Sequence, residues 1–281
     1  METGENNPIL IQTERFNIGL ATSYHLSIQL GTYHFSYCLL NSSTLTYDYV
    51  KKYSLNSKDN IASEITEIIN NDDILKAEFS SQSLAFVNFP STLVPESLYK
   101  KEEAETLLSF NTKVTGKVLA DNIVSQKAYL IYSVPESILG IVSTFFPKAK
   151  YKAQESILIQ QYSQLNTENT KTYLYLNEQK LGITIFDSDK LIFNNSFKYT
   201  SKEDLLYYLL FSLEQLNLSP NSIDVTVFGS IEDSDEHFIL LYEYIRNIKL
   251  GKRPHQFSFP AEFNSLADHK YFGLFTQILC V

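Results

Sequence analysis

The stretch SIQLGTYHFSYCLL, residues 27–40, decides how the rest of the chain is interpreted. Its apolar residues alternate with polar ones on both sides of a step formed by Gly31 and Thr32, and alternation with a period of two predicts β-strands. A Gly-Thr step between two strands is typical of a turn whose backbone amides face a phosphate. Gln29 occupies the position where a metal-assisted turn would need an acid. The stretch is therefore a nucleotide site, the remnant of one, or only a β-hairpin.

The residues that follow continue this pattern and then change period. Turn residues at 41–44 lead into a third alternating strand at 45–49, which predicts a three-stranded antiparallel meander. Isoleucines at helical spacing then predict a helix over 57–70. The later pattern predicts a strand at 83–89, a loop and helix over 91–110, a strand at 128–134, and helices over 136–146 and 153–165.

The same order of elements restarts after residue 170. An offset of 146 residues superimposes Leu39 on Ile185, Leu45 on Leu191, Tyr47 on Phe193 and Tyr53 on Tyr199. Internal repeats change the expected fold, so this one takes priority. The second series predicts strands at 172–176, 181–186 and 191–200, a helix over 201–218, a strand at 222–230, a helix over 236–248, a strand at 255–260 and a helix over 266–279.

Two such series predict an α/β protein made of two halves. Each half is expected to hold a mixed sheet, with a three-stranded antiparallel meander, flanked by helices. The predicted division is an N-terminal extension over 1–19, a first half over 20–165 and a second half over 166–281. The cleft between the halves is the default place for a ligand.

This order of elements resembles the actin-like ATPase superfamily, which includes actin, hexokinase and heat-shock chaperones and is built from two ribonuclease-H-like halves. The closer resemblance is to bacterial assembly members, the pilus-assembly protein PilM and the secretion protein GspL, and to an uncharacterised bacterial family of unknown function. It covers about residues 20–281 and rests on element order and the repeat. The resemblance implies a cytoplasmic protein that binds another protein, and a cleft where active members hold ATP and magnesium.

The turns that hold ATP in active members are incomplete in this sequence. The first turn keeps Gly31 and Thr32, but Gln29 replaces the acid that manages the metal. The second turn, at 176–182, lacks the expected Asp-x-Gly-Gly, and Glu178 would face phosphates with the wrong sign. The third turn keeps Gly229 and Ser230, but the acidic run 232–236 follows it.

The resemblance therefore implies a vestigial nucleotide cleft formed by Gly31, Thr32, Gly229 and Ser230, with no catalytic residue, no metal ligand and no cofactor. We expect a non-catalytic scaffold or protein-binding module that offers a groove or sheet edge to a partner segment. The alternative is a weak ATP-binding sensor or an ATPase that uses ATP and magnesium in the cleft. His34, close to Gly31, is predicted to be a solvent-facing strand residue rather than a ligand.

Composition narrows the partner classes further. The net charge of −9 is unfavourable for binding a nucleic-acid backbone. The sequence contains no run of about 18 apolar residues, so no membrane insertion is expected. Its N-terminus, METGENNPIL, does not resemble a signal peptide, and Cys38 and Cys280 are expected to be reduced thiols, consistent with the cytoplasm. Among the 19 tyrosines and 19 phenylalanines, a subset in 35–53 could form an adhesive sheet edge, and a homodimer is left open.

Overall fold

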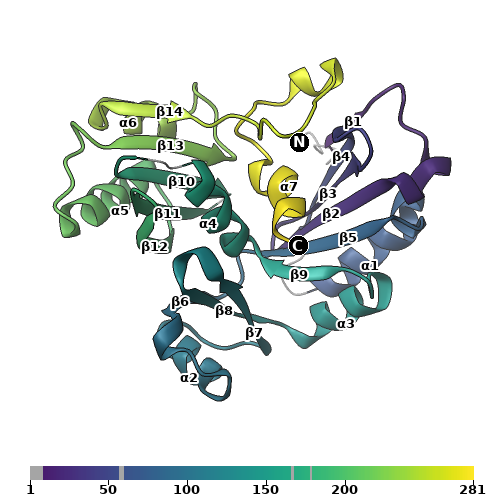
Figure 1. The fold of residues 1–281 in the computed structure, drawn as a ribbon, viewed down its shortest axis with the longest axis horizontal. Coiled ribbons are helices and arrows are strands. Elements are labelled where there is room, and N and C mark those ends of the chain that lie inside the picture. Colours follow the sequence, from purple (N-terminus) through teal and green to yellow (C-terminus); the bar gives the residue numbers. More distant parts are fainter. Residues whose placement is uncertain (1–8, 57–59, 166–167, 178) are drawn as a thin grey trace, which may run out of the picture.

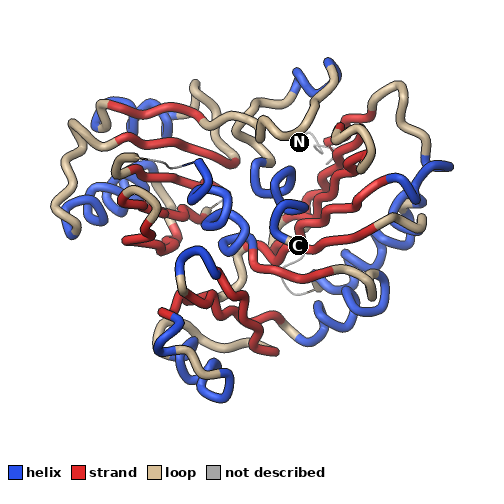
Figure 2. The backbone as a smooth tube through the Cα atoms, viewed as in Figure 1, coloured by secondary structure: helices blue, strands red, loops and turns tan. Residues whose placement is uncertain are grey.

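The computed structural model describes residues 9–56, 60–165, 168–177 and 179–281, in which three β-sheets are surrounded and separated by helices (Figure 1, Figure 2). The first sheet has the strand order β1–β4–β3–β2–β5–β9. The three strands β2, β3 and β4 form the predicted antiparallel meander, whereas β5 runs parallel to β2, and β9 parallel to β5. The bounds are β1 (Ile9–Gln12), β2 (Tyr24–Gly31), β3 (His34–Asn41), β4 (Thr46–Ser54), β5 (Ser81–Val87) and β9 (Lys150–Ala153).

The second sheet repeats this arrangement with the order β12–β11–β10–β13–β14. Again three strands form an antiparallel meander and two parallel strands extend it on the other side. The predicted fold of two actin-like halves with mixed sheets is therefore confirmed, whereas the offset of 146 residues and the division at 165 and 166 remain predictions. The bounds are β10 (Lys171–Asn177), β11 (Lys180–Asp187), β12 (Lys190–Lys198), β13 (Asp224–Gly229) and β14 (Asn247–Leu250).

A third sheet, which the sequence pattern did not reveal, has the order β6–β8–β7. It contains β6 (Ser91–Pro95), β7 (Lys117–Ile123) and β8 (Ala128–Val134). The α-helices are α1 (Ile61–Asn71), α2 (Ala104–Ser109), α3 (Glu136–Phe145), α4 (Gln154–Leu165), α5 (Lys202–Gln215), α6 (Glu236–Tyr244) and α7 (Phe272–Thr276). Short 3-10 helices are η1 (Ile18–Ser23), η2 (Asp73–Lys76), η3 (Glu96–Leu98), η4 (Lys101–Glu103), η5 (Val124–Gln126), η6 (Ala261–Ser265) and η7 (Gln277–Cys280). None of the helices described is long and apolar enough to span a membrane.

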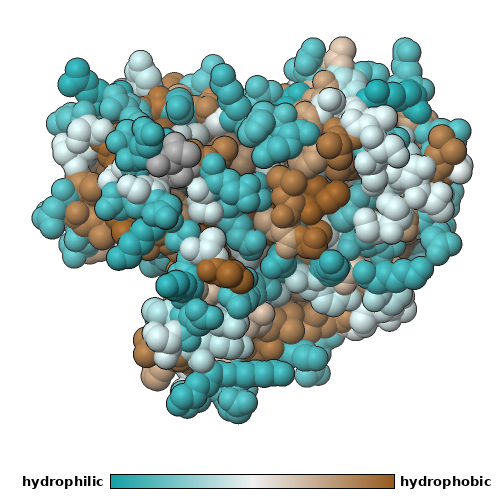
Figure 3. All heavy atoms as spheres, viewed as in Figure 1, coloured by the Kyte–Doolittle hydropathy of each residue, from teal (hydrophilic) through white to brown (hydrophobic). Residues whose placement is uncertain are grey.

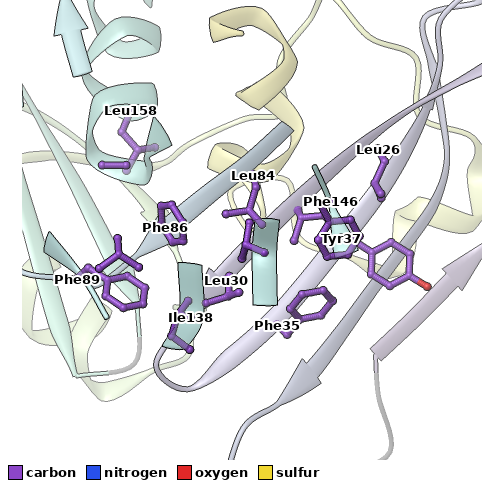
Figure 4. Close-up of a cluster of buried hydrophobic side chains, with 14 of the residues drawn as sticks. Leu26, Leu30, Phe35, Tyr37, Leu84, Phe86, Phe89, Ile138, Phe146 and Leu158 are labelled. Atoms are coloured by element: carbon purple, nitrogen blue, oxygen red, sulfur yellow. The ribbon is translucent and has the colours of Figure 1, made fainter. Parts of the chain in front are cut away.

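Each large sheet is covered on its outer face by two helices. Helices α1 and α3 pack on the first sheet, where Ile65 and Ile138 belong to the same core as Leu26 and Leu30. Figure 4 shows Ile138, Leu26 and Leu30 within this core. On the second sheet, α5 and α6 contribute leucines such as Leu209 and Leu241 to a separate core. This burial explains why the alternating apolar residues of both meanders predicted strands correctly.

Helices α4 and α7 lie between the two large sheets (Figure 1), where α7 contacts β2 and β3 and α4 contacts β5 and β9 of the first sheet. The rings of Tyr162 and Tyr173 stack at 4.4 Å, and the rings of Phe228 and Phe272 lie 4.3 Å apart. These aromatic contacts join the two halves through one continuous core. On β2, both faces are consequently buried, and the polar side of its alternation lies under the C-terminal helices.

Several element predictions are corrected by the fold. The strand that extends the first sheet is β9 and not 128–134, which forms β8 of the third sheet. Residues 9–12 of the predicted extension form β1, because their backbone pairs with β4. Residues 91–95, at the start of the predicted loop and helix over 91–110, form strand β6, because they pair with β8. His34 is buried rather than solvent-facing. Residues 57–59 of the predicted first helix lie outside the described residues.

The C-terminal third also differs from its pattern. Helix α6 ends at Tyr244, and 247–250 is strand β14, because its backbone pairs with β13. The predicted strand at 255–260 is reduced to one isolated bridge, between Ser258 and Thr46. The predicted helix over 266–279 begins only at Phe272, where it packs against the first sheet.

Candidate functional site

The first predicted turn joins β2 to β3 and contains Gly31 and Thr32. Gly31 is the last residue of β2 and pairs with Val87 of β5. A Cβ atom on Gly31 would lie 3.3 Å from the His34 ring, so the turn packs closely on its own hairpin. Thr32 lines a hollow of about 540 Å³ together with Asn177 at the end of β10. Thr32 and Tyr33 are therefore the residues of this turn that are placed to meet a ligand there.

Gln29, the residue in place of the expected acid, is buried between β2 and α7. Its side chain is 3% exposed, and a Cβ atom on Gly273 would lie 3.2 Å from its Nε2 atom. Within the described part of the chain, Gln29 Nε2 has no hydrogen-bond partner. A neutral carboxamide does not supply the charge that a magnesium ion prefers. Helix α7 thus packs against the residue that stands in place of the expected acid.

The second turn, between β10 and β11, has no glycine pair in its sequence, and its cation at Lys180 is engaged. Lys180 Nζ lies 3.3 Å from Glu155 Oε1, and each side chain is 19% exposed, so this cation is already paired. Asn177 is 5% exposed and lines three neighbouring hollows. Glu178, predicted to oppose phosphates, lies outside the described residues.

The third turn has the backbone shape of a ligand turn, but its donors are occupied. Gly229 has a φ of +98°, and a Cβ atom there would lie 2.0 Å from the carbonyl oxygen of Leu176, so only glycine fits. The Gly229 N–H donates to the carbonyl oxygen of His269 at 3.0 Å. The Ser230 N–H donates to the carbonyl oxygen of Leu176 at 2.7 Å. Both amides predicted to face a ligand therefore bond within the protein.

The acidic run that follows is also held internally. The Glu232 N–H donates to Asp235 Oδ2 at 2.8 Å, and the Glu232 carboxylate pairs with the Lys270 ammonium. His269 Nε2 bonds to the carbonyl oxygen of Ile231, which ties the turn to the C-terminal segment a second time. Residues 269 and 270 thus hold the third turn in place, while the Ser230 side chain stays exposed.

The predicted residues do not gather into one site. Gly229 and Ser230 line a cleft of about 390 Å³ with Gln29, whereas Thr32 lines the neighbouring hollow, and Asn177 lines both. In the described ranges, no group of three or more His, Cys, Asp or Glu side chains could hold a metal. A magnesium nucleotide therefore fits this arrangement poorly, because Glu232 and Asp235, the acids that line the cleft, are bonded to Lys270 and to the Glu232 N–H, and the amides of the third turn are already bonded.

A further hollow, of about 400 Å³, lies between β6 of the third sheet and β12 of the second, and sequence reasoning missed it. Its lining is rich in carboxamides, which come from segments far apart in the chain. Only the Asn194-Asn195 pair stands out in the sequence, and nothing there links it to the others. The residues that line this amide groove are Asn88, Ser91, Thr92, Leu93, Asn111, Leu130, Gln154, Glu155, Leu158, Tyr175, Asn177, Lys180, Gly182, Thr184, Asn194, Asn195 and Ser196.

Comparison with known families gives one match, over residues 13–248, to a family described as "Protein of unknown function (DUF3822)". No curated protein matches the chain.

Solved structures agree on the fold. A Bacteroides thetaiotaomicron protein with an actin-like ATPase fold and unknown function has a TM-score of 0.81 and 19% identity, covering 95% of this chain and 99% of that one. The PilM–PilN type IV pilus biogenesis complex has a TM-score of 0.58 at 12% identity, covering 91% and 97%. The ethanolamine utilization protein EutJ from Carboxydothermus hydrogenoformans has a TM-score of 0.51 at 8% identity, covering 92% and 90%. At these identities the similarity shows the actin-like fold alone.

Proposed function

Because the chain belongs to the DUF3822 family of proteins of unknown function and has an actin-like fold, we propose that it is a non-catalytic scaffold or protein-binding module of the bacterial cytoplasm. Its nucleotide motifs are degraded, and its partner is another protein. A homodimer is one form that such an interaction could take.

The observation that carries this proposal is the internal bonding of Gly229 and Ser230. A ligand that recruited both amides would first have to break two hydrogen bonds, and a typical intramolecular hydrogen bond contributes about 1 kcal/mol to stability. Gln29 offers no charge in return, and α7 packs against it. The nucleotide cleft therefore starts at an energetic disadvantage.

Two further observations support a protein partner. The similar PilM structure is that of a complex with PilN, so a chain with this fold can serve as one member of a protein assembly. The net charge of −9 disfavours nucleic acid as a partner. The proposal therefore rests on the state of the cleft, with the partner class supported by the fold and by charge.

A thermal melt with Mg-ATP and with Mg-ADP tests the proposal. A ligand at a hundredfold excess over its dissociation constant stabilises the folded state by about 2.7 kcal/mol, which is readily measured. We expect no change in melting temperature with either nucleotide. A rise that the variant Thr32→Arg abolishes would contradict the proposal.

The second candidate function is a weak ATP-binding sensor or ATPase that uses Gly31, Thr32, Gly229 and Ser230. One observation favours it: Gln29 Nε2 is buried, lines the cleft and has no partner in the described chain, so it could donate to a phosphate oxygen. The same melt separates the two candidates, because this one requires the rise in melting temperature.

A further inference from the structure

The amide groove is flanked by two strands that each end a sheet. Strand β6 is the outer strand of the third sheet, and β12 is the outer strand of the second sheet. Residues 91–93 of β6 and 194–196 of β12 line the groove. Figure 3 shows the outline of the molecule indented between the lobe that carries β12 and the lobe that carries β6–β8. Two strand edges thus border one hollow of about 400 Å³.

The direction of the backbone groups on β12 follows from its hydrogen bonds. Tyr199 N–H donates to the carbonyl oxygen of Gln179, toward β11. Backbone groups alternate in direction along a strand, so the N–H and C=O groups of Asn194 and Ser196 point away from β11. The Ser196 N–H accordingly bonds to Asn195 Oδ1 at 2.8 Å rather than to β11. The edge of β12 therefore presents backbone groups toward the side of the groove.

The same reasoning applies to β6. Ser133 N–H of β8 donates to the carbonyl oxygen of Pro90 at 3.0 Å, which directs residue 90 toward β8. Alternation then points the N–H and C=O groups of Ser91 and Leu93 away from β8, on the side without a neighbouring strand. Both borders of the groove thus present outward-facing backbone groups, those of Ser91 and Leu93 on β6 and of Asn194 on β12, whereas the Ser196 N–H is already bonded.

A strand-like contact already exists at the start of β12, outside the residues that line the groove. The Gln126 side chain, in η5, donates from Nε2 to the carbonyl oxygen of Asp189 at 3.0 Å, and its Oε1 accepts from the Leu191 N–H at 2.8 Å. A carboxamide carries the same donor and acceptor as a peptide group. The backbone near the start of β12 is therefore paired by an amide that comes from the side of the third sheet.

The charge of the lining limits what can enter. Glu155 and Lys180 are the ionisable groups with a formal charge in it, and they pair with each other. The remaining polar lining consists of carboxamides and hydroxyls. A charged side chain placed in the groove would lose hydration without gaining a partner of opposite sign. The groove therefore favours a neutral occupant rich in amide groups.

We propose that the amide groove binds an extended, uncharged peptide segment of a partner protein by strand addition. The backbone of the segment pairs with the exposed edges of β6 and β12, and the carboxamides of the lining meet its small polar side chains. This inference rests on the proposed protein-binding function and assigns that function to one surface, which is separate from the cleft at Gly229 and Ser230.

The test screens a random library of linear peptides for binding to the full chain. The peptides are about six residues long, which is the length of an ordinary strand. We expect uncharged peptides to be enriched. N-methylation of either set of alternate backbone amides should abolish binding, because a strand between two edges pairs with one edge through every second residue and with the other edge through the residues between them. Full affinity after N-methylation of either set would overturn strand addition between β6 and β12.

Two substitutions locate the binding site. Asn195→Arg places a long cation at an exposed groove position and should weaken the selected peptides at least tenfold. The matched control Asn247→Arg, at an exposed position on the opposite outer strand β14, should leave their affinity unchanged. Peptides that bind both variants equally would overturn the groove while leaving the proposed function intact. A library without enriched peptides would also overturn it, whereas nucleotide binding would instead overturn the proposed function.

Discussion

The turn at Gly229 and the amide groove are both bordered by backbone amides, and those amides are in opposite states. At the turn, Gly229 and Ser230 donate to carbonyl oxygens of the protein itself. At the groove, the outward groups of Ser91 and Asn194 lie on strand edges that have no neighbouring strand. A chain can therefore keep the backbone shape of a ligand turn although the N–H groups of that turn are hydrogen-bonded within the protein. The N–H groups that face away from their own sheets lie instead at the amide groove.

The largest effect is expected at the turn itself, from Gly229→Ala. The added Cβ would lie 2.0 Å from the Leu176 carbonyl oxygen, on a backbone with a φ of +98°. We expect a loss of about 3 to 5 kcal/mol in the free energy of unfolding, measured by urea denaturation.

The control for that variant is Gly140→Ala in α3, where an added Cβ meets no atom within 4 Å. This change should stabilise the protein by about 0.5 to 1 kcal/mol, because alanine favours a helix over glycine. Equal effects from the two glycine variants would show that the turn is not constrained as described.

The next largest effect is expected from two proline substitutions, which test whether the N–H groups of β8 and β6 point toward or away from the third sheet. Ser133→Pro removes an N–H that donates from β8 to Pro90, and should cost about 3 kcal/mol. Ser91→Pro removes an N–H that points away from the sheet, and should cost less than about 1 kcal/mol. Urea denaturation of both variants gives the comparison. A Ser91→Pro cost as large as that of Ser133→Pro would mean that the edge of β6 is already paired.

A third prediction concerns how much the hydrogen-bonded carboxylate of Asp72 contributes to the free energy of unfolding. Burial alone would raise the pKa of the Asp72 carboxyl, but hydrogen bonds from Tyr37 at 2.6 Å, Tyr53 at 2.7 Å and Lys51 at 3.0 Å outweigh it and hold the pKa below the ordinary 3.8. Because the folded pKa is depressed, this stability is present above pH 3.8 and is lost as the pH falls through the folded value. Asp72→Asn should cost about 2 kcal/mol at neutral pH and flatten the acid limb of the stability curve.

The pKa of the Asp121 carboxyl is shifted in the opposite direction from that of Asp72. Its burial raises the pKa above the ordinary 3.8, although Ser156 and the Ala153 N–H bond to the carboxylate. The folded state then holds its proton more tightly, so stability falls as the pH rises from 3.8 through the raised value. Urea denaturation of the wild type, Asp72→Asn and Asp121→Asn between acid and neutral pH separates these slopes. The same slope change in both variants would refute the assignment.

Much of the fold could be predicted from local pattern. Alternation at Leu26, Ile28 and Leu30 predicted a strand correctly, because one face of β2 does pack on the outer core. The pattern failed where long-range pairing overrides it. Ile245 and Ile248 have helical spacing, yet 247–250 pairs with β13 and forms a strand.

The candidate site was less predictable than the fold. The sequence shows that Gln29 replaces an acid, but not that α7 buries it. The contact of Gln277 with the carbonyl oxygen of Ile28, which fixes the C-terminal segment under β2, spans 249 residues. The N–H groups of Gly229 and Ser230 likewise donate to carbonyl oxygens of distant residues, which no local motif identifies. Bonds between distant segments therefore decide whether a turn that looks like a ligand site can act as one.

Amide hydrogen exchange of the free protein tests the central contrast most directly. We expect the amides of Gly229 and Ser230 to exchange at least about a hundredfold more slowly than unstructured amides, which corresponds to an opening free energy of about 2.7 kcal/mol. The outward amides of Ser91, Leu93 and Asn194 should exchange close to the unstructured rate. Rapid exchange at Gly229 and Ser230, with slow exchange at the groove, would show that the turn is open and the strand edges are paired.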